Sequence, residues 1–297
     1  MKQVLVICGP TASGKTALSV ELAKRFHTEI ISGDSIQVYK GLDIGSGKVT
    51  SEEMQGIPHH LIDILEPNEP YSAKDFQSHA RALIDQIDFP IIAGGTGLYL
   101  KACLYDYDFP EEEEDDTVER LEKKSDEELY QTLLSVDPKQ AEKIHPNNRR
   151  RIIRALTIYY RMGKPMSETI AEQSHDMIYD VFFAGCTMER SLLYERIDLR
   201  VDRMFETGLS EEVERLIDSG VTFNDPAMKG IGYREFEGFY RNEMTVDEVK
   251  AKIKLDSHRY AKRQYTWLNH QFPVHWFDVT KPDVYENVYE EVRRWKK

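Results

Sequence analysis

The chain has 297 residues, which at roughly 150 residues per domain allows two domains or one large domain carrying an insertion. Hydrophobic residues make up 40% of the chain and aromatic residues 10%, which excludes a largely disordered protein. The net charge of -13 argues against nucleic-acid binding through overall electrostatic attraction. We therefore expect a globular protein in which the local distribution of charge matters more than its total.

No apolar stretch approaches the roughly 20 residues needed to span a bilayer, and the first one, residues 4–8, runs into a glycine-rich turn. The three cysteines, Cys8, Cys103 and Cys186, are far apart and show no C-x-x-C spacing, which argues against a disulfide framework or a zinc site. These features predict a cytoplasmic protein without a membrane partner, in which each cysteine is a small buried residue.

Short apolar and β-branched runs alternate with helical patterns through the first hundred residues. These runs lie at residues 4–8, 29–32, 61–64 and 90–93. Such alternation predicts βαβ units and a parallel sheet. Two later runs, at residues 179–186 and 274–277, could add two more strands.

Strand signals are missing between about residues 110 and 177, where several helices are predicted instead, at residues 126–135, 138–144 and 148–162. Further helices are predicted at residues 189–207, 210–219 and 245–270, with Thr245 as the N-cap of the last. We interpret residues 111–177 as a helical insertion. Residues 1–110 would then form the first part of an α/β core, which residues 178–297 complete with C-terminal helices.

Residues 9–16 match the phosphate-binding pattern G-x-x-x-x-G-K-[ST] in full, between a predicted strand and a predicted helix. Backbone N–H groups of such a loop surround a di- or triphosphate, the lysine adds positive charge, and the last hydroxyl can join a Mg²⁺ shell. The predicted diphosphate- or nucleotide-binding residues are Gly9, Pro10, Thr11, Ala12, Ser13, Gly14, Lys15 and Thr16, with Mg²⁺ as cofactor and Thr16 as its ligand. The fold class expected is α/β, a P-loop NTPase-like parallel sheet flanked by helices, with a helical insertion domain.

Two further turns follow predicted strands, at the sheet edge where open α/β folds bind ligands. Asp34 is interpreted as a general base, an outer-shell Mg²⁺ partner, or an ordinary turn residue. Thr96 lies in a glycine-rich turn that either brings backbone close to a ligand or is purely structural. His59 and His60 are adjacent in a predicted strand region and would point to opposite faces, so we expect packing or hydrogen bonding rather than chelation.

Charge is distributed unevenly within the insertion. Acidic residues predominate at residues 111–128, whereas residues 145–165 hold six cations and no acid. The six are Arg149, Arg150, Arg151, Arg154, Arg161 and Lys164. Because no neighbouring acid in the sequence neutralises them, they indicate either contacts with RNA phosphates or a solvated helix face. A second cationic stretch lies at residues 250–263.

Several motifs, in this order, resemble those of the tRNA dimethylallyltransferases, also called tRNA isopentenyltransferases. They are GPTASGKT at residues 9–16, Asp34-Ser35-x-Gln37-x-Tyr39 followed by Asp43-Ile44-Gly45, Pro58-His59-His60-Leu61-Ile62-Asp63, GGTGLY at residues 94–99, Ile231-Gly232-Tyr233, and RYAKRQYTW at residues 259–267. The resemblance spans nearly the whole chain. Ser46-Gly47-Lys48 stands where Thr-Ala-Lys is expected, a change we take as conservative in bulk. Asn148 replaces an Asp and Thr157 a Glu, and both lie in the insertion, where they affect only details of RNA contact.

This resemblance implies transfer of the dimethylallyl group from dimethylallyl diphosphate to N6 of the adenine 3′-adjacent to the tRNA anticodon, with release of diphosphate. It implies Asp34, Lys15 and Thr96 as catalytic residues in an enzyme, expected to be a monomer, that binds the anticodon stem-loop. The implied tRNA-binding residues are Asp34, Ser35, Ile36, Gln37, Thr96, Arg150, Arg151, Ile152, Ile153 and Arg154. The residues by themselves leave three alternatives: a P-loop small-molecule kinase, an adenylate prenyltransferase, and a non-enzymatic RNA-binding module.

Overall fold

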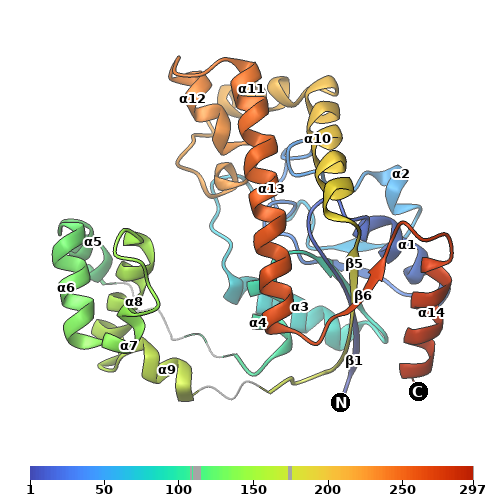
Figure 1. The fold of residues 1–297 in the computed structure, drawn as a ribbon, viewed down its shortest axis with the longest axis horizontal. Coiled ribbons are helices and arrows are strands. Elements are labelled where there is room, and N and C mark those ends of the chain that lie inside the picture. The colour runs from blue at the N-terminus through green and yellow to red at the C-terminus, as the bar shows by residue number, and fades with distance from the viewer. Residues whose placement is uncertain (108, 110–114, 173–175, 297) are drawn as a thin grey trace. The chain divides into compact units, whose positions relative to one another are not determined.

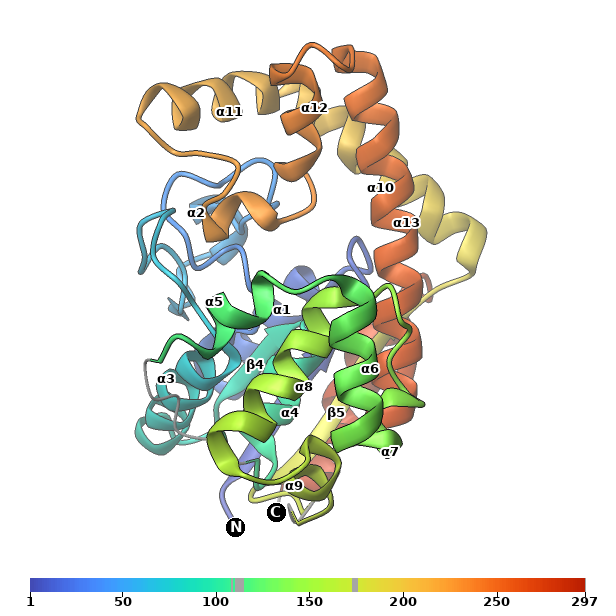
Figure 2. The same cartoon turned by 90° about the vertical axis from the view of Figure 1, so that its left-hand side faces the viewer.

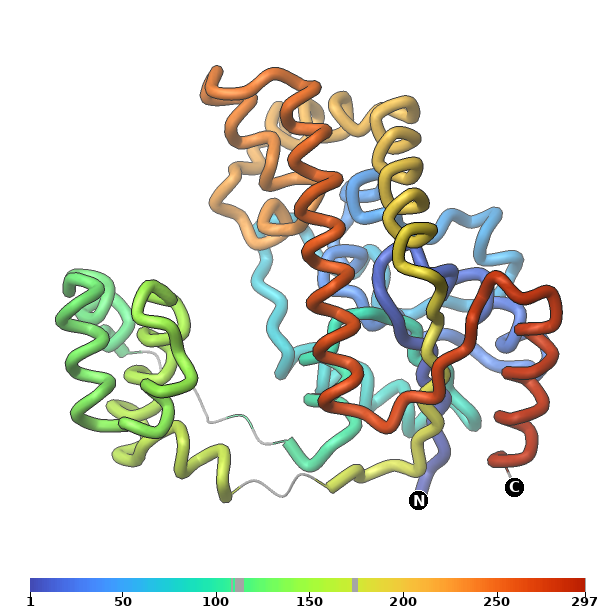
Figure 3. Tube along the Cα trace, in the orientation of Figure 1, coloured from blue at the N-terminus to red at the C-terminus, as the bar shows by residue number. Residues whose placement is uncertain are grey.

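The computed structural model describes residues 1–107, 109, 115–172 and 176–296. The chain forms two compact units, one made of Met1–Leu104 with Met177–Lys297 and the other of Tyr105–Asp176 (Figure 1). It leaves the first unit after Leu104 and re-enters it at Met177 (Figure 3). The second unit contains most of the predicted insertion. It begins at Tyr105, whereas the sequence predicts that the insertion begins at residue 111.

A six-stranded parallel sheet forms the centre of the first unit, in the order β3-β2-β4-β1-β5-β6. The strands are β1 (Gln3–Cys8), β2 (Ile30–Ser32), β3 (His59–His60), β4 (Ile91–Gly94), β5 (Asp180–Thr187) and β6 (His275–Asp278). In the central strand β1, Leu5 is in register with Ile91 of β4 and Phe182 of β5. The predicted α/β class with a P-loop-like parallel sheet is confirmed.

The predicted strand at residues 61–64 is wrong, because β3 ends at His60. Leu61 and Asp63 have φ angles of 62° and 54°, a left-handed conformation that breaks a strand. The backbone N–H of Asp63 donates to the carbonyl of Gln37 instead of to a sheet neighbour. The apolar run at this place therefore belongs to a turn that packs on the segment after β2.

Helices cover both faces of the sheet (Figure 1). The helices of the first unit are α1 (Lys15–Phe26), α2 (Ser51–Met54), α3 (Ala73–Gln86), α4 (Gly97–Leu104), α10 (Arg190–Glu206), α11 (Leu209–Asp218), α12 (Glu237–Tyr240), α13 (Val246–Gln271) and α14 (Val284–Trp295), with 3-10 turns η1 (Pro226–Lys229) and η2 (Arg234–Phe236). Thr245 caps α13, as predicted, in a capping box with Glu248. Helices α10 and α13 pack against each other and extend beyond the carboxyl edge of the sheet.

The first unit has more than one core. One lies between β1, β4 and β5 and the apolar faces of α1 and α14. Another, beyond the carboxyl edge of the sheet, joins residues 38–42 to α10, α11 and α13 around the fully buried rings of Tyr233 and Phe236. This second core fixes the segment that follows β2, so it also positions the turn that contains Asp34.

The second unit is a small helical bundle (Figure 2). Its helices are α5 (Thr117–Glu122), α6 (Asp126–Val136), α7 (Pro138–Ala141), α8 (Arg149–Met162) and α9 (Met166–Glu172). Helices α6 and α8 pack together around Leu129, Leu133, Ile152 and Leu156. Among the residues that the structure describes, in either unit, no helix combines the length and the apolar character needed to cross a bilayer.

Candidate active site

Three turns from different parts of the sequence meet at the carboxyl edge of the sheet. Strands β2, β4 and β1 are neighbours in that order and parallel, so the turns that follow them lie side by side. These turns hold residues 33–37, residues 95–97 and the phosphate-binding loop of residues 9–16. The sheet thus brings together Asp34, Thr96 and Lys15, which the sequence analysis identified separately.

The phosphate-binding loop ends where α1 begins. Gly14 precedes this helix with a φ of 90°, a conformation that favours glycine, and it offers no side chain to cap the first amides. These amides and the positive end of the helix are therefore available to an anion. The Lys15 ammonium donates to the Pro10 carbonyl at 2.7 Å, and burial lowers the pKa of Lys15 to about 8. The Thr16 side chain in the same turn is exposed.

Gln264 of α13 links two of the three turns. Its Oε1 accepts from the Thr11 backbone N–H at 2.9 Å, and its Nε2 donates to the Gly95 carbonyl at 3.0 Å. A Cβ on Gly95 would lie 2.2 Å from that Nε2 atom, so the glycine is needed for this close approach. The sequence predicts no individual role for Gln264, although this residue lies in the motif at residues 259–267.

Asp34 occupies the turn after β2. Its Oδ1 accepts from the backbone N–H groups of Ile36 at 2.8 Å and Gln37 at 3.2 Å, so the interpretation as a turn residue is correct for one carboxylate oxygen. No described residue donates a hydrogen bond to the other oxygen. The Asp34 charge opposes the effect of burial on the pKa of Lys15 and of Arg200, so the three side chains lie within electrostatic range of one another.

Two of the three turns carry a buried hydroxyl. Thr96 Oγ1 is buried beside the Tyr260 phenol without a hydrogen bond of good geometry to any described residue, and Ser13 Oγ is likewise without a partner. Burial, and after it the Asp34 charge, raises the pKa of Tyr260 to about 12, so its phenol stays protonated at neutral pH. Each hydroxyl can both donate and accept a hydrogen bond, so both can contribute to binding a polar ligand.

Arg200 of α10 had no signal in the sequence. Its Nη2 lies 3.3 Å from the Gly47 carbonyl, and burial lowers the pKa of its guanidinium. Gly47 has a φ of +56°, and a Cβ there would lie 1.6 Å from Arg200 Nη2. The expectation that Gly47 in place of alanine is conservative in bulk is therefore wrong, because the guanidinium occupies the space of the missing methyl group.

Lys48, the neighbour of Gly47, contacts the motif at residues 58–63 and gives that motif a structural role. Its buried ammonium donates to the Tyr39 carbonyl at 2.8 Å, to Asp43 Oδ1 at 2.6 Å and to Asp63. The motif at residues 58–63 therefore helps, through Asp63, to anchor the segment that follows β2. A single buried charge with these acceptors holds three pieces of chain together.

The adjacent histidines make separate hydrogen bonds, as predicted. His59 Nδ1 lies 2.8 Å from the Ile57 carbonyl, and His60 Nε2 lies 2.6 Å from Glu29 Oε2. Within the described residues, no group of three or more His, Cys, Asp or Glu side chains could hold a metal ion. Any ion here would therefore need ligand oxygens to complete its coordination.

The cysteines are buried and free, as expected. Burial raises the pKa of each thiol, to about 12 for Cys103 and Cys186, so they stay protonated and unreactive at neutral pH.

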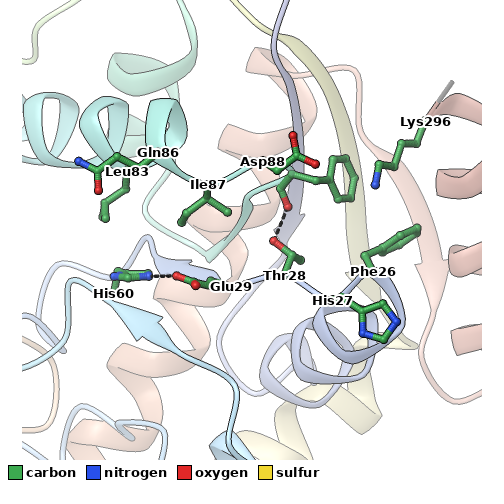
Figure 4. Close-up of a pocket in the computed structure, with 11 residues that line it drawn as sticks. Phe26, His27, Thr28, Glu29, His60, Leu83, Gln86, Ile87, Asp88 and Lys296 are labelled. Atoms are coloured by element: carbon green, nitrogen blue, oxygen red, sulfur yellow. Dashed lines mark hydrogen bonds and ion pairs between the residues drawn. The ribbon is translucent and has the colours of Figure 1, made fainter.

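A pocket of about 370 Å³ lies apart from these turns, beside the segments that precede β2 and β4 (Figure 4). It is lined by Phe26, His27, Thr28, Glu29, His60, Leu83, Gln86, Ile87, Asp88, Phe89 and Lys296. The His60 and Glu29 side chains pair across it. It contains none of the predicted site residues and plays no part in the chemistry proposed below.

The six cations of the second unit differ in their surroundings. Arg149 pairs with Asp126 at 2.5 Å, Arg161 pairs with Asp115 at 2.8 Å, and Lys164 pairs with Glu172. The prediction that no acid neutralises this stretch is therefore wrong for these three, because folding brings acids from outside it. Part of the acidic run, residues 111–114, lies outside the described residues.

Arg150 and Arg151 begin α8 with exposed side chains and form no ion pair with a described residue, and Arg154 is also exposed. Ile152 has no exposed surface and packs in the core of this unit, with Ile153 against it. The implied tRNA-binding role of Ile152 and Ile153 stays a prediction, and the Ile152 side chain has a structural role. It holds α8 in place, whereas the arginines face solvent.

Two departures from the family pattern in this unit have structural roles. Asn148 caps α8, accepting from the Arg151 backbone N–H at 3.4 Å, as an aspartate would. Thr157 is buried and donates to the Ile153 carbonyl at 2.8 Å. Asn148 and Thr157 therefore both act in the structure of α8 and not at its exposed surface.

In the second cationic stretch, on α13, Lys250 and Lys254 share the Asp202 carboxylate. Lys262 and Arg263 are exposed nearer the carboxyl edge of the sheet.

The chain is similar to known proteins in both sequence and structure. The model of the family described as IPP transferase matches residues 37–271, and that of isopentenyl transferase matches residues 2–65. The chain is 49% identical to a tRNA dimethylallyltransferase of Anoxybacillus flavithermus, covering 98% of this chain and 95% of the relative. It is 46% identical to the Bacillus subtilis protein of that name, covering 94% and 91%.

Solved structures agree with these relatives. A tRNA isopentenylpyrophosphate transferase of Bacillus halodurans has a TM-score of 0.76 and 40% identity, covering 99% of this chain and 97% of that one. A eukaryotic dimethylallyltransferase, captured acting on tRNA, has a TM-score of 0.85 and 30% identity, covering 98% of this chain and 78% of that one.

Proposed function

The chain belongs to the IPP transferase family, and from this membership we propose that its carboxyl-edge site transfers the dimethylallyl group of dimethylallyl diphosphate to tRNA. The acceptor is N6 of the adenine 3′-adjacent to the anticodon, and diphosphate is released. One observation carries the assignment of the site: the parallel sheet brings a phosphate-binding loop and a carboxylate to one edge, and the half-buried Arg200 lies within electrostatic range of both Lys15 and Asp34.

The diphosphate binds at the phosphate-binding loop. In the reaction, the bond between C1 of the dimethylallyl group and the diphosphate oxygen breaks, and its electron pair leaves with diphosphate. Negative charge therefore grows on the diphosphate in the transition state, while the allylic carbon becomes cationic. The loop amides, Lys15 and Arg200 stabilise that growing charge, and the buried environment strengthens their effect.

Asp34 acts on the acceptor. An adenine amino group is a poor nucleophile because its lone pair is delocalised into the ring, so proton removal must accompany bond formation. Oδ1 of Asp34 is held by two backbone amides, which fixes the carboxylate and leaves Oδ2 to accept the N6 proton as N6 bonds to C1. Thr96, with its buried hydroxyl beside the same space, orients the acceptor or the diphosphate.

The residues present also fit Mg²⁺. Mg²⁺ binds proteins through one or two oxygen ligands and completes its shell with phosphate oxygens and water. The exposed Thr16 hydroxyl would be such a ligand, beside the diphosphate-binding amides. When bound there, Mg²⁺ would supply further neutralisation of the departing diphosphate.

We assign tRNA phosphate contacts to the exposed arginines of α8, chiefly Arg150 and Arg151. The target base must leave the anticodon stack, which costs a few kcal/mol, less in a loop than in a duplex. Phosphate contacts elsewhere offset that cost. We propose that the chain acts in the cytoplasm, because tRNA is its substrate, and that it acts as a monomer.

The test is transfer of label from dimethylallyl diphosphate, in the presence of Mg²⁺, to tRNA, AMP or ATP. We expect label on tRNA alone. Label on AMP or ATP would instead indicate an adenylate prenyltransferase, and phosphoryl transfer from ATP without prenylation would indicate a kinase. The Lys15→Ala variant, which should fold normally, should lose turnover severely, because the charge that Lys15 stabilises grows in the transition state.

A further inference from the structure

Three successive backbone amides converge on one buried carboxylate. Glu212 of α11 is 2% exposed. Its Oε2 accepts from the N–H groups of Asp43 at 3.0 Å and Ile44 at 2.8 Å, and its Oε1 accepts from that of Gly45 at 3.1 Å. No described residue forms an ion pair with Glu212, so neutral donors alone stabilise its charge.

Tyr233 supplies the fourth donor. Its hydroxyl donates to Glu212 Oε1 at 2.7 Å and accepts from the Ser46 N–H at 3.1 Å, while its ring packs on Gly45. Burial, followed by the Glu212 charge, raises the pKa of the Tyr233 phenol, so it remains a donor. Glu212 thus holds residues 43–46, directly through three amides and indirectly through Tyr233.

The next residues of this segment face the active site. The Gly47 carbonyl accepts from Gln37 Nε2 at 3.2 Å and from Arg200 Nη2 at 3.3 Å. Arg200 also packs on the Gly47 α-carbon, since a Cβ there would lie 1.6 Å from Nη2. The position of the guanidinium is therefore set by a segment whose own position depends on Glu212.

We propose that Glu212 is a positioning residue for diphosphate binding, acting through the 43–47 segment on Arg200; this rests on the role of Arg200 given above. Only an ionised carboxylate accepts hydrogen bonds on both oxygens from four donors. A glutamine would turn its NH₂ group toward two of them. Those donors would lose their acceptor, and the segment would shift away from α11.

The first test compares Glu212→Gln with Glu211→Gln, an exposed neighbour in the same helix turn that undergoes the same chemical change. We expect Glu212→Gln to raise KM for dimethylallyl diphosphate about tenfold, which corresponds to about 1.4 kcal/mol of lost binding free energy. Glu211→Gln should stay within about twofold of the unmodified protein. A loss of folded protein alone would lower apparent kcat and leave KM unchanged, and that result would overturn the proposal.

The second test is a double-mutant cycle with Arg200→Gln. If Glu212 acts through Arg200, adding Glu212→Gln to the Arg200→Gln protein should raise KM by less than about twofold, because residues that act together are not additive. An equal rise in both backgrounds would show that Glu212 acts by another route and would overturn the proposal. An Arg200→Gln protein with unchanged KM would remove the role of Arg200 itself, and the inference with it.

Tyr233→Phe covers the case in which Glu212→Gln does not fold. This change keeps the buried ring and the three amide contacts of Glu212, and removes only the hydroxyl that holds Ser46. We expect KM to rise about threefold in this variant, again only while Arg200 is present. An unchanged KM in folded Tyr233→Phe would count against the proposal.

Discussion

The charge on Lys15 should make diphosphate binding depend on pH in a definite direction. Burial lowers the pKa of Lys15 to about 8, well below the usual value for lysine. The protonated form binds the diphosphate, so binding is complete below that pKa and weakens as pH rises through it. At pH 9, only about one tenth of unliganded molecules keep the Lys15 charge.

The assay is kcat/KM for dimethylallyl diphosphate between pH 7 and 9.5 at saturating tRNA, because this ratio reports the groups of the free enzyme. Above pH 8 we expect a fall of about tenfold for each pH unit. The terminal phosphate of the substrate, with a pKa near 6, is fully ionised through this range and does not contribute.

Lys15→Arg provides the control, since a guanidinium stays charged at these pH values. Its remaining kcat/KM should not fall between pH 8 and 9.5. A flat profile for the unmodified protein up to pH 9.5 would refute the argument that burial lowers this pKa. An unchanged alkaline fall in Lys15→Arg would assign the titration to another group.

The remaining predictions concern the base, the RNA contacts and the link between the turns. Asp34→Asn keeps an oxygen that accepts from the two backbone amides, so we expect its tRNA dissociation constant to stay within several-fold of that of the unmodified protein and its kcat to fall by about 10²-fold or more. Weaker tRNA binding at unchanged kcat would contradict the role of Asp34 as a general base. The double change Arg150→Ala and Arg151→Ala should weaken tRNA binding and reduce the slope of log affinity against log salt concentration by roughly 1.5. Arg294→Ala, which removes an exposed arginine of α14, is the control. An unaltered slope in the double variant would place both arginines on a solvated face. Gln264→Leu should lower the free energy of unfolding by about 1–3 kcal/mol, because the buried Gly95 carbonyl and the part-buried Thr11 N–H lose their partner. Urea unfolding would show a change below about 1 kcal/mol if water replaces the glutamine.

Much of the site could be predicted from the sequence because its parts are local. A strand, a glycine turn and a helix start are close in the sequence, which is why residues 9–16 by themselves predict an anion site, and the structure has the strand and the helix on either side of the loop. The parallel sheet followed from the alternation of strands and helices, and it brings Asp34 and Thr96 to the same edge. Thr245 was predictable as a cap for the same reason, since its partner lies three residues away.

Contacts between distant residues were decided only by the tertiary structure. Arg200 lies more than 150 residues from the carbonyl that it contacts, and no periodicity or motif marks it among the other arginines of α10. The run at residues 61–64 has the composition of a strand, but two left-handed residues and a hydrogen bond to Gln37 turn it away from the sheet. Arg149, Arg161 and Lys164 are paired with acids that lie outside residues 145–165. Sequence patterns report what a segment does with its neighbours along the chain, whereas these contacts depend on which surfaces packing brings together.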